Sequence, residues 1–97
     1  MDITERQRKM LRGLGHNLKP VIFVGQAGAS DAVLKELEQS LAHHELLKVN
    51  IRGADRADRD NTISALVTNT GAQLIQRIGN MALLYRRHPK HPKIKLG

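Results

Sequence analysis

Residues 21–30 read VIFVGQAGAS and combine the signals of a strand, a turn and the start of a helix. Its first four residues have high β-propensity and no polar alternation, so they predict a well-buried strand. Gly25 and Gly28 predict a tight turn, because glycine accepts left-handed backbone dihedral angles and leaves room for the close approach of another group. Ser30 is a preferred N-cap residue and places the start of a helix at Asp31. A buried strand that leads through a turn into a helix predicts an α/β domain.

The N-terminal segment predicts an amphipathic helix over residues 4–16. Thr4 followed by Gln7 is a capping-box pattern, which marks the beginning of a helix. Apolar side chains that share one arc of this helix predict a buried stripe. They are Ile3, Met10, Leu11, Leu14 and Leu18. The rest of the helix surface is basic.

After the turn, the pattern predicts two more helices and three more strands. Residues 31–44 should form the helix that Ser30 caps. Residues 46–52 alternate between apolar and polar, which predicts a strand with Lys48 and Arg52 on its polar side. Residues 58–70 predict a third helix that ends at Gly71. Gly79 and Asn80 separate two apolar segments and predict a two-residue hairpin of type II′.

The order α-β-α-β-α-β-β predicts an open two-layer domain. Each β-α-β unit favours parallel neighbouring strands joined by a right-handed crossover, whereas the hairpin requires an antiparallel last strand. A four-stranded mixed sheet with the helices packed on one face satisfies both conditions. We expect a single domain over residues 1–97, with a core to about residue 86. The basic tail over residues 87–97 contains HPKHPK, which favours an extended, solvated and mobile chain.

The net charge of +7 is concentrated at the two ends of the chain. Residues 1–19 carry +3, residues 20–85 carry −1, and the remainder carries +5. Such an excess favours RNA, DNA or an acidic membrane as partner, although charged ends also keep a small protein soluble.

The absence of cysteine excludes disulfides and cysteine-ligated zinc. With no long apolar segment and no signal peptide, the sequence predicts a cytoplasmic protein without a membrane anchor.

The glycine turn is a candidate anion site. Unpaired backbone N–H groups and the helix dipole converge where a strand ends and a helix begins, and both favour a bound phosphate. Glycine is also common in such turns for geometry alone, so the spacing by itself leaves both interpretations open. The turn lacks the lysine of a Walker A loop and the third glycine of a dinucleotide fingerprint, which disfavours a bound mononucleotide relative to a polymer backbone.

The sequence offers no catalytic or metal site. His43 and His44 are adjacent on a predicted helix, so they point about 100° apart and cannot chelate one ion; near the helix end they favour the dipole, and we expect His44 to be partly buried. Three aspartates over residues 55–60 suit the start of a helix. We therefore expect no enzyme activity, no metal, no cofactor and no small-molecule substrate. The buried strand should also enclose Phe23, which would leave no exposed ring for base stacking.

Three segments together resemble a known family: RGLGHNLKPVIFVGQAG, LAHHELLKVNI and IGNMALLYR. In this order and spacing the chain is similar to the CRM domain (chloroplast RNA splicing and ribosome maturation), and in particular to short stand-alone bacterial members of the YhbY type. The resemblance implies an open α/β fold similar to the C-terminal domain of translation initiation factor three, and a GxxG loop like that of KH domains. It also implies RNA binding without catalysis, with bacterial members associated with precursors of the large ribosomal subunit.

One feature departs from the family pattern. The family loop often carries a basic residue between its glycines, where this chain has Gln26 and Ala27. The loop should therefore hold a phosphate through backbone N–H groups, with a hydrogen bond from Gln26, and the basic ends should supply the attraction.

The resulting hypothesis is a non-enzymatic protein that binds structured ribosomal RNA during assembly of the large subunit. The predicted RNA-binding residues are Gly25, Gln26, Ala27, Gly28, Arg6, Arg8, Lys9, Arg12, Lys19, Lys48, Arg52, Arg86 and Arg87. Two alternatives stay open: an adaptor that binds acidic proteins or DNA, and an enzyme that binds a small phosphorylated molecule at the turn.

Overall fold

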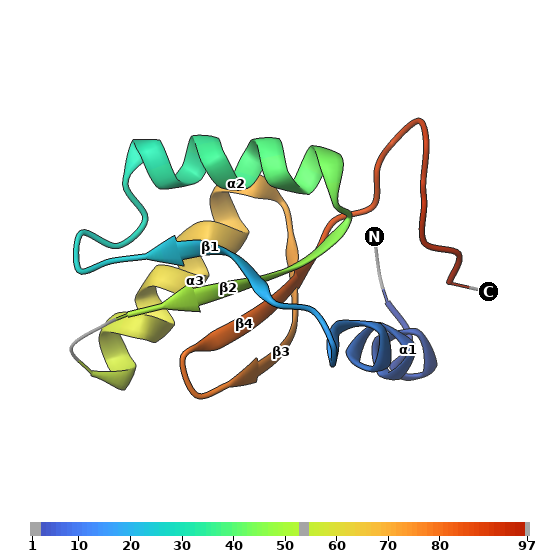
Figure 1. Cartoon of the computed structure of the whole chain (residues 1–97), viewed down its shortest axis with the longest axis horizontal. Coiled ribbons are helices and arrows are strands. Elements are labelled where there is room, and N and C mark those ends of the chain that lie inside the picture. Colours follow the sequence, from blue (N-terminus) through green and yellow to red (C-terminus); the bar gives the residue numbers. More distant parts are fainter. Residues whose placement is uncertain (1–2, 53–54, 97) are drawn as a thin grey trace.

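The computed structural model describes residues 3–52 and 55–96 (Figure 1). Its helices and strands follow one another in the predicted order. They are α1 (Glu5–Gly15), β1 (Pro20–Val24), α2 (Asp31–His43), β2 (Leu46–Ile51), α3 (Arg56–Thr70), β3 (Gln73–Ile78) and β4 (Met81–Tyr85). Within the described ranges, every helix is too short or too polar to cross a membrane.

The predicted helix starts are confirmed by their side-chain caps. At α1, the Gln7 backbone N–H donates to the Thr4 hydroxyl over 3.1 Å, and the Thr4 N–H donates to the Gln7 side chain over 3.0 Å. At α2, the Val33 N–H donates to the Ser30 hydroxyl over 3.3 Å. These bonds satisfy donors that the first helical turn would otherwise leave unpaired, so they fix where each helix begins.

The third helix begins slightly earlier than predicted. Asp55 is its N-cap, and its carboxylate accepts a hydrogen bond from the Asp58 N–H over 2.9 Å. Gly71 ends the helix as predicted, with φ of 74°. Gly79 has φ of 57° and Asn80 does not have a positive φ, as a type II′ hairpin requires.

The strands form one mixed sheet in the order β1-β2-β4-β3. β1 and β2 are parallel neighbours, and β4 is antiparallel to both β2 and β3. The four-stranded mixed sheet is thus confirmed, but the prediction that both β-α-β units join neighbouring strands is wrong for the second. β4 lies between β2 and β3 because it is apolar on both faces: Ala82 and Leu84 are buried on one face, and Leu83 and Tyr85 on the other.

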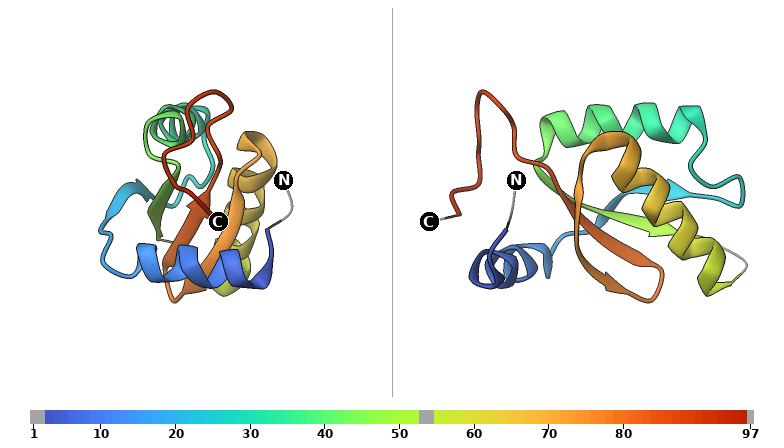
Figure 2. Two further views of the ribbon diagram at one scale, coloured as in Figure 1. Left: turned by 90° about the vertical axis from the view of Figure 1, so that its right-hand side faces the viewer. Right: turned by 180° about the vertical axis from the view of Figure 1, so that it is seen from behind.

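The helices cover both faces of the sheet, whereas we expected them on one. α2 and α3 pack on the first face, where Leu37 and Leu66 meet β-strand residues such as Val49. α1 packs on the second face, where Leu11 meets Leu83 and Tyr85 (Figure 2). α1 therefore covers apolar side chains of β4 that α2 and α3 cannot reach.

The close contact of α1 with the sheet depends on Gly15. A Cβ added there would lie 2.5 Å from a methyl carbon of Leu83, so a larger residue would displace this buried side chain. Gly15 and Leu11 are the buried residues of the helix.

Two predictions of burial are wrong. In β1, Ile22 and Val24 are buried, but Val21 is 50% exposed and Phe23 is 58% exposed, because the second face of the sheet is open beyond α1. In and after α1, Leu14 is 47% exposed, and Met10 and Leu18 are 39% exposed. Periodicity identified the apolar arc of α1 but could not show how narrow its contact with the sheet is.

The tail also differs from the expected solvated, mobile segment. Glu45, which is 3% exposed, accepts hydrogen bonds from the backbone N–H groups of His88 (2.8 Å), Lys93 (2.5 Å) and Ile94 (2.7 Å). Ile94 and Leu96 pack against the same apolar cluster as α1. The tail is therefore docked on the domain.

Candidate nucleic-acid interface

The GxxG turn that follows β1 is closed by its own backbone. The Gly28 N–H donates to the Gly25 carbonyl over 3.1 Å, and the Ser30 N–H donates to the Gly28 carbonyl over 2.9 Å. Gly28 has φ of 70°, which requires glycine, whereas Gly25 does not have a positive φ. A Cβ on Gly25 would meet no atom within 4 Å, so the turn does not need this glycine for packing.

The turn presents unused backbone donors. The N–H groups of Gln26, Ala27 and Ala29 have no acceptor within residues 3–52 and 55–96. They lie at the N-terminus of α2, a helix of 13 residues whose dipole adds partial positive charge. The arrangement suits an anion such as a phosphate.

A cleft of about 510 Å³ adjoins the turn. The loop forms one wall, and the first turns of α3 form another with Asp58, Asn61 and Thr62. Arg52 also lines the cleft, because its backbone N–H donates to the Val24 carbonyl (2.8 Å) and places it beside the end of β1. The carboxylate of Asp58 repels anions, so a phosphate bound in the cleft should lie near the loop and Arg52, away from α3.

The sequence assigned Arg52 to the RNA-binding surface through the polar side of its strand but did not place it beside the turn, and it gave no sign of Asn61 and Thr62. Both lie in α3, more than thirty residues from the loop, and their side chains meet it only through the packing of α3 beside α2. The Thr62 hydroxyl lies 3.4 Å from where a Cβ of Gly28 would be.

The predicted basic residues of the N-terminal segment divide into two groups. Arg6, Lys9 and Lys19 are exposed and free to attract a polyanion. The guanidinium of Arg8, by contrast, donates to the carbonyls of Leu74 (2.9 Å) and Ile75 (3.2 Å), so it fastens α1 to β3. Arg12 is partly exposed, with a nitrogen 4.0 Å from the Glu5 carboxylate.

The predicted basic residues outside the N-terminal segment likewise include an exposed side chain and side chains bound within the protein. Arg87 is exposed. Arg86 pairs with Glu38 over 2.6 Å and donates to the Thr70 carbonyl over 3.0 Å, and its hydrogen bond lowers the pKa of Glu38. The Lys48 ammonium lies 3.4 Å from the carbonyl of His16.

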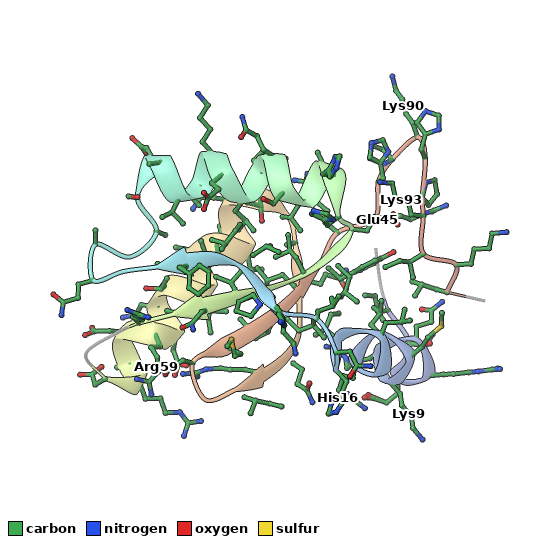
Figure 3. All side chains as sticks on the ribbon, viewed as in Figure 1. Lys9, His16, Glu45, Arg59, Lys90 and Lys93 are labelled. Atoms are coloured by element: carbon green, nitrogen blue, oxygen red, sulfur yellow. The ribbon has the colours of Figure 1, made fainter. Side chains whose placement is uncertain are left out.

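The loop and the basic ends of the chain lie far apart. The domain is 38 Å long, and Figure 1 shows the turn between β1 and α2 at one end of this axis, with α1 and the tail at the other. Lys9 projects from α1 and Lys90 from the tail at this second end (Figure 3). An RNA that contacts both sites must follow the length of the sheet.

A basic cluster at the loop end was missed by the sequence reasoning. Arg56, Arg59 and Arg77 line a hollow of about 270 Å³ beside the hairpin at Gly79, and Figure 3 shows Arg59 at this end of the domain. Asp60 pairs with Arg77, not with Arg56 as an isolated helix would suggest. These arginines come from a nearly neutral part of the sequence, so charge counting could not find the cluster.

The histidines show no sign of a metal site. His43 and His44 are both exposed, with ring centroids 4.9 Å apart and nearly perpendicular rings. The expectation that His44 is partly buried is therefore wrong. In the described ranges, no group of three histidine or carboxylate side chains could hold an ion.

Comparisons with known proteins identify the family of the chain. The sequence model of the CRS1 / YhbY (CRM) domain matches residues 3–86. A probable RNA-binding protein of Pseudomonas aeruginosa is 43% identical over 93 residues, which cover 96% of this chain and 89% of that protein. A probable RNA-binding protein of Bacillus subtilis is 33% identical over 97% of this chain and 98% of its own. These relatives are named as RNA-binding proteins, not as enzymes.

The fold has a match among solved structures. A Staphylococcus aureus protein whose structure was determined in solution superimposes with a TM-score of 0.84 at 29% identity, over 99% of this chain and 100% of that one. The match extends over the tail as well as the core.

Proposed function

Because the chain belongs to the CRS1 / YhbY (CRM) domain family, we propose that it is a non-enzymatic RNA-binding protein. The observation that carries the proposal is the GxxG turn beside one cleft. It combines three backbone N–H groups without an acceptor in the described part of the chain, the N-terminus of α2 and the side chain of Arg52. These are the elements that hold a phosphate of a nucleic-acid backbone.

The electrostatic attraction of RNA comes mainly from the end of the domain opposite the GxxG turn. The exposed side chains of Arg6, Lys9, Lys19 and Arg87 provide a positive field that concentrates RNA near the surface. Arg8 and Arg86 contribute charge, but their hydrogen bonds serve the fold. The loop then positions one phosphate, since its tip carries Gln26 and Ala27 in place of a basic residue.

The proposed target is ribosomal RNA of the large subunit or its precursor particle, bound in the cytoplasm during assembly. The family resemblance supports this target, and the length of the domain supports a structured RNA that reaches both ends of its 38 Å axis. An adaptor for acidic proteins or DNA is the alternative that the charge alone would allow.

A binding assay at several salt concentrations tests the electrostatic part. With about five phosphate contacts, raising the salt from 50 to 200 mM should weaken binding about 100-fold. Affinity for ribosomal RNA that does not change with salt would refute the proposal, and stronger binding to duplex DNA or to an acidic protein would favour the adaptor.

A matched pair of glycine variants tests the turn. Gly25→Ala adds a methyl group in open space at the loop, and Gly13→Ala adds one in open space on α1. If the methyl group costs one charge-assisted hydrogen bond of about 1.5 kcal/mol, Gly25→Ala should bind RNA about 10-fold more weakly. Gly13→Ala should bind as the unmodified protein does. Equal affinities of both variants at unchanged melting temperature would remove the turn from the interface.

Crosslinking in cells, followed by sequencing of the attached RNA, tests the target. Enrichment of one region of large-subunit ribosomal RNA is the expected result. Crosslinks spread over unrelated transcripts would contradict the ribosomal target without contradicting RNA binding.

Thermal-shift screening with nucleotides and sugar phosphates tests the enzyme alternative. Saturable stabilisation by one such compound would favour that alternative.

A further inference from the structure

The second face of the sheet is open between α1 and the GxxG turn. In the sheet register, Phe23 pairs with Asn50, Asn50 with Met81, and Met81 with Ile78, so these four side chains form one row across the strands. Their neighbours along β1 and β2, such as Ile22 and Val49, are buried on the first face, which places the row on the second. α1 covers other residues of this face, which are Leu46, Ile75, Leu83 and Tyr85.

Phe23 is the unusual member of this row. The ring is 58% exposed, although large aromatic side chains gain most from burial. Val21 on the same strand and Ile78 at the far edge are also exposed, by 50% and 66%. Exposed apolar side chains on one open sheet face of a small domain favour binding at that face.

The charges around Phe23 identify the partner. Lys48 lies on the same face of β2, two residues before Asn50, and Arg52 lies two residues after it beside the GxxG cleft. Gly25 follows Phe23 by two residues, roughly 7 Å along the strand. The Lys48 ammonium is bound to the His16 carbonyl, which leaves Arg52 as the cation for a ligand beside the turn. An exposed aromatic ring two residues from a phosphate-binding turn suits a nucleotide, whose base is flat and apolar and whose phosphates are negative.

Asn50 adds a polar group beside the ring. Its Oδ1 atom is buried and accepts no hydrogen bond from the described parts of the chain. An unpaired buried oxygen costs free energy, which rotation of the amide toward a ligand would recover. The amide offers both a donor and an acceptor to the edge of a base.

We infer that the open face of the sheet binds an unpaired RNA base stacked on Phe23, while the adjacent GxxG turn holds a phosphate of the same strand. This inference rests on the proposed function and makes it more specific. The RNA then includes a single-stranded or bulged nucleotide, because a base inside a duplex cannot present its face to the ring.

A tryptophan reporter tests the contact directly. The chain has no tryptophan, so Phe23→Trp introduces a single indole at the proposed site, and Ile78→Trp places one on the same face at the far edge. Titration with a single-stranded oligoadenylate should quench the fluorescence of Phe23→Trp in a saturable way, and a duplex of equal length should not. The fluorescence of Ile78→Trp should change little with either RNA.

Affinity measurements separate this inference from the proposed function. Phe23→Leu keeps an apolar side chain and removes the ring, so it should weaken binding of the oligoadenylate on the order of 10-fold and leave duplex binding unchanged. Phe23→Tyr should bind both RNAs as the unmodified protein does. Since the side chain is exposed, melting temperatures should be unchanged.

Each other outcome has one meaning. If the unmodified protein binds neither these RNAs nor ribosomal RNA, the proposed function fails. If it binds ribosomal RNA but not the oligoadenylate, stacking is refuted and the proposed function stands. Stacking is refuted, and the proposed function stands, if Phe23→Leu binds the oligoadenylate with unchanged affinity. The same holds if Phe23→Leu binds the oligoadenylate and the duplex more weakly by the same factor. A change of sedimentation with Phe23→Leu, without a change of affinity, would assign the face to a second copy of the chain and also refute it.

Discussion

Replacement of Glu45 by glutamine should release the tail from the domain. The Glu45 carboxylate accepts from the N–H groups of Lys93 and Ile94 at one oxygen and of His88 at the other, within 2.5–2.8 Å. Glutamine has the same shape but only one acceptor oxygen. It can keep two of the three bonds in weaker, uncharged form, and its amide nitrogen faces the third N–H, which then has no acceptor.

The size of the effect follows from these bonds. A hydrogen bond to a charged group contributes about 1.5–3 kcal/mol and a neutral one about 0.5–1.5 kcal/mol. Losing one charged bond and weakening two therefore costs about 3 kcal/mol of tail docking, after allowance for relaxation of the tail. This corresponds to a roughly 100-fold larger population of the undocked tail.

Amide hydrogen exchange measures this population at individual residues. Protection of the three donating amides should fall by up to about 100-fold in Glu45→Gln, while protection in the buried strands stays unchanged. Glu36→Gln, which makes the same chemical change at an exposed position of α2, is the control. Equal protection of the tail amides in the two variants would refute the assignment of Glu45 as the anchor.

The same carboxylate should make the docking dependent on pH. Burial raises the pKa of Glu45, but the N–H donors of the tail and the nearby His88 outweigh burial, so its pKa lies below the ordinary value of 4.5. The docked state then binds fewer protons than the undocked state, and docking is fully stabilised above about pH 4.5 and lost as the pH falls through the lowered pKa. Protection factors of the tail amides should fall on acidification in the unmodified protein but not in Glu45→Gln.

Two further predictions concern the attachment of α1 to the sheet. Gly15→Ala should lower the free energy of unfolding by about 1–3 kcal/mol, because the new methyl group would overlap the side chain of Leu83; denaturant unfolding measures the loss, and an unchanged midpoint would show that Leu83 moves aside freely. Arg8→Met keeps the apolar stem but removes the bonds to the carbonyls of Leu74 and Ile75, so it should cost about 1–3 kcal/mol. If Arg8→Met instead weakens RNA binding at unchanged stability, Arg8 belongs to the RNA surface.

The local signals of the sequence were reliable where a short segment decides its own conformation. Thr4, Ser30, Gly71 and Gly79 begin or end their elements as predicted, because caps and left-handed glycines act within a few residues of the chain. The strand at residues 46–52 was also predicted with its correct buried side. Such features depend on hydrogen bonds and steric limits that operate before any tertiary contact forms.

The failed predictions all concern long-range packing. Residues 21–24 read as a buried strand, but β1 lies at the edge of a sheet whose second face α1 covers only in part, so Phe23 is exposed. Whether a helix lies above a given strand position depends on contacts far along the chain. Periodicity does not contain this information.

The helices and strands, the mixed sheet, the glycine turn and the positive charge at the two ends of the chain follow from local patterns in the sequence. Contacts between distant segments place β4 between β2 and β3, anchor the tail on Glu45, and bring Arg52 beside the turn while Phe23 faces solvent. The two groups of features differ because capping, turn geometry and charge act over a few residues. Burial and hydrogen-bond partners, by contrast, are set by which distant segments share a face of the sheet.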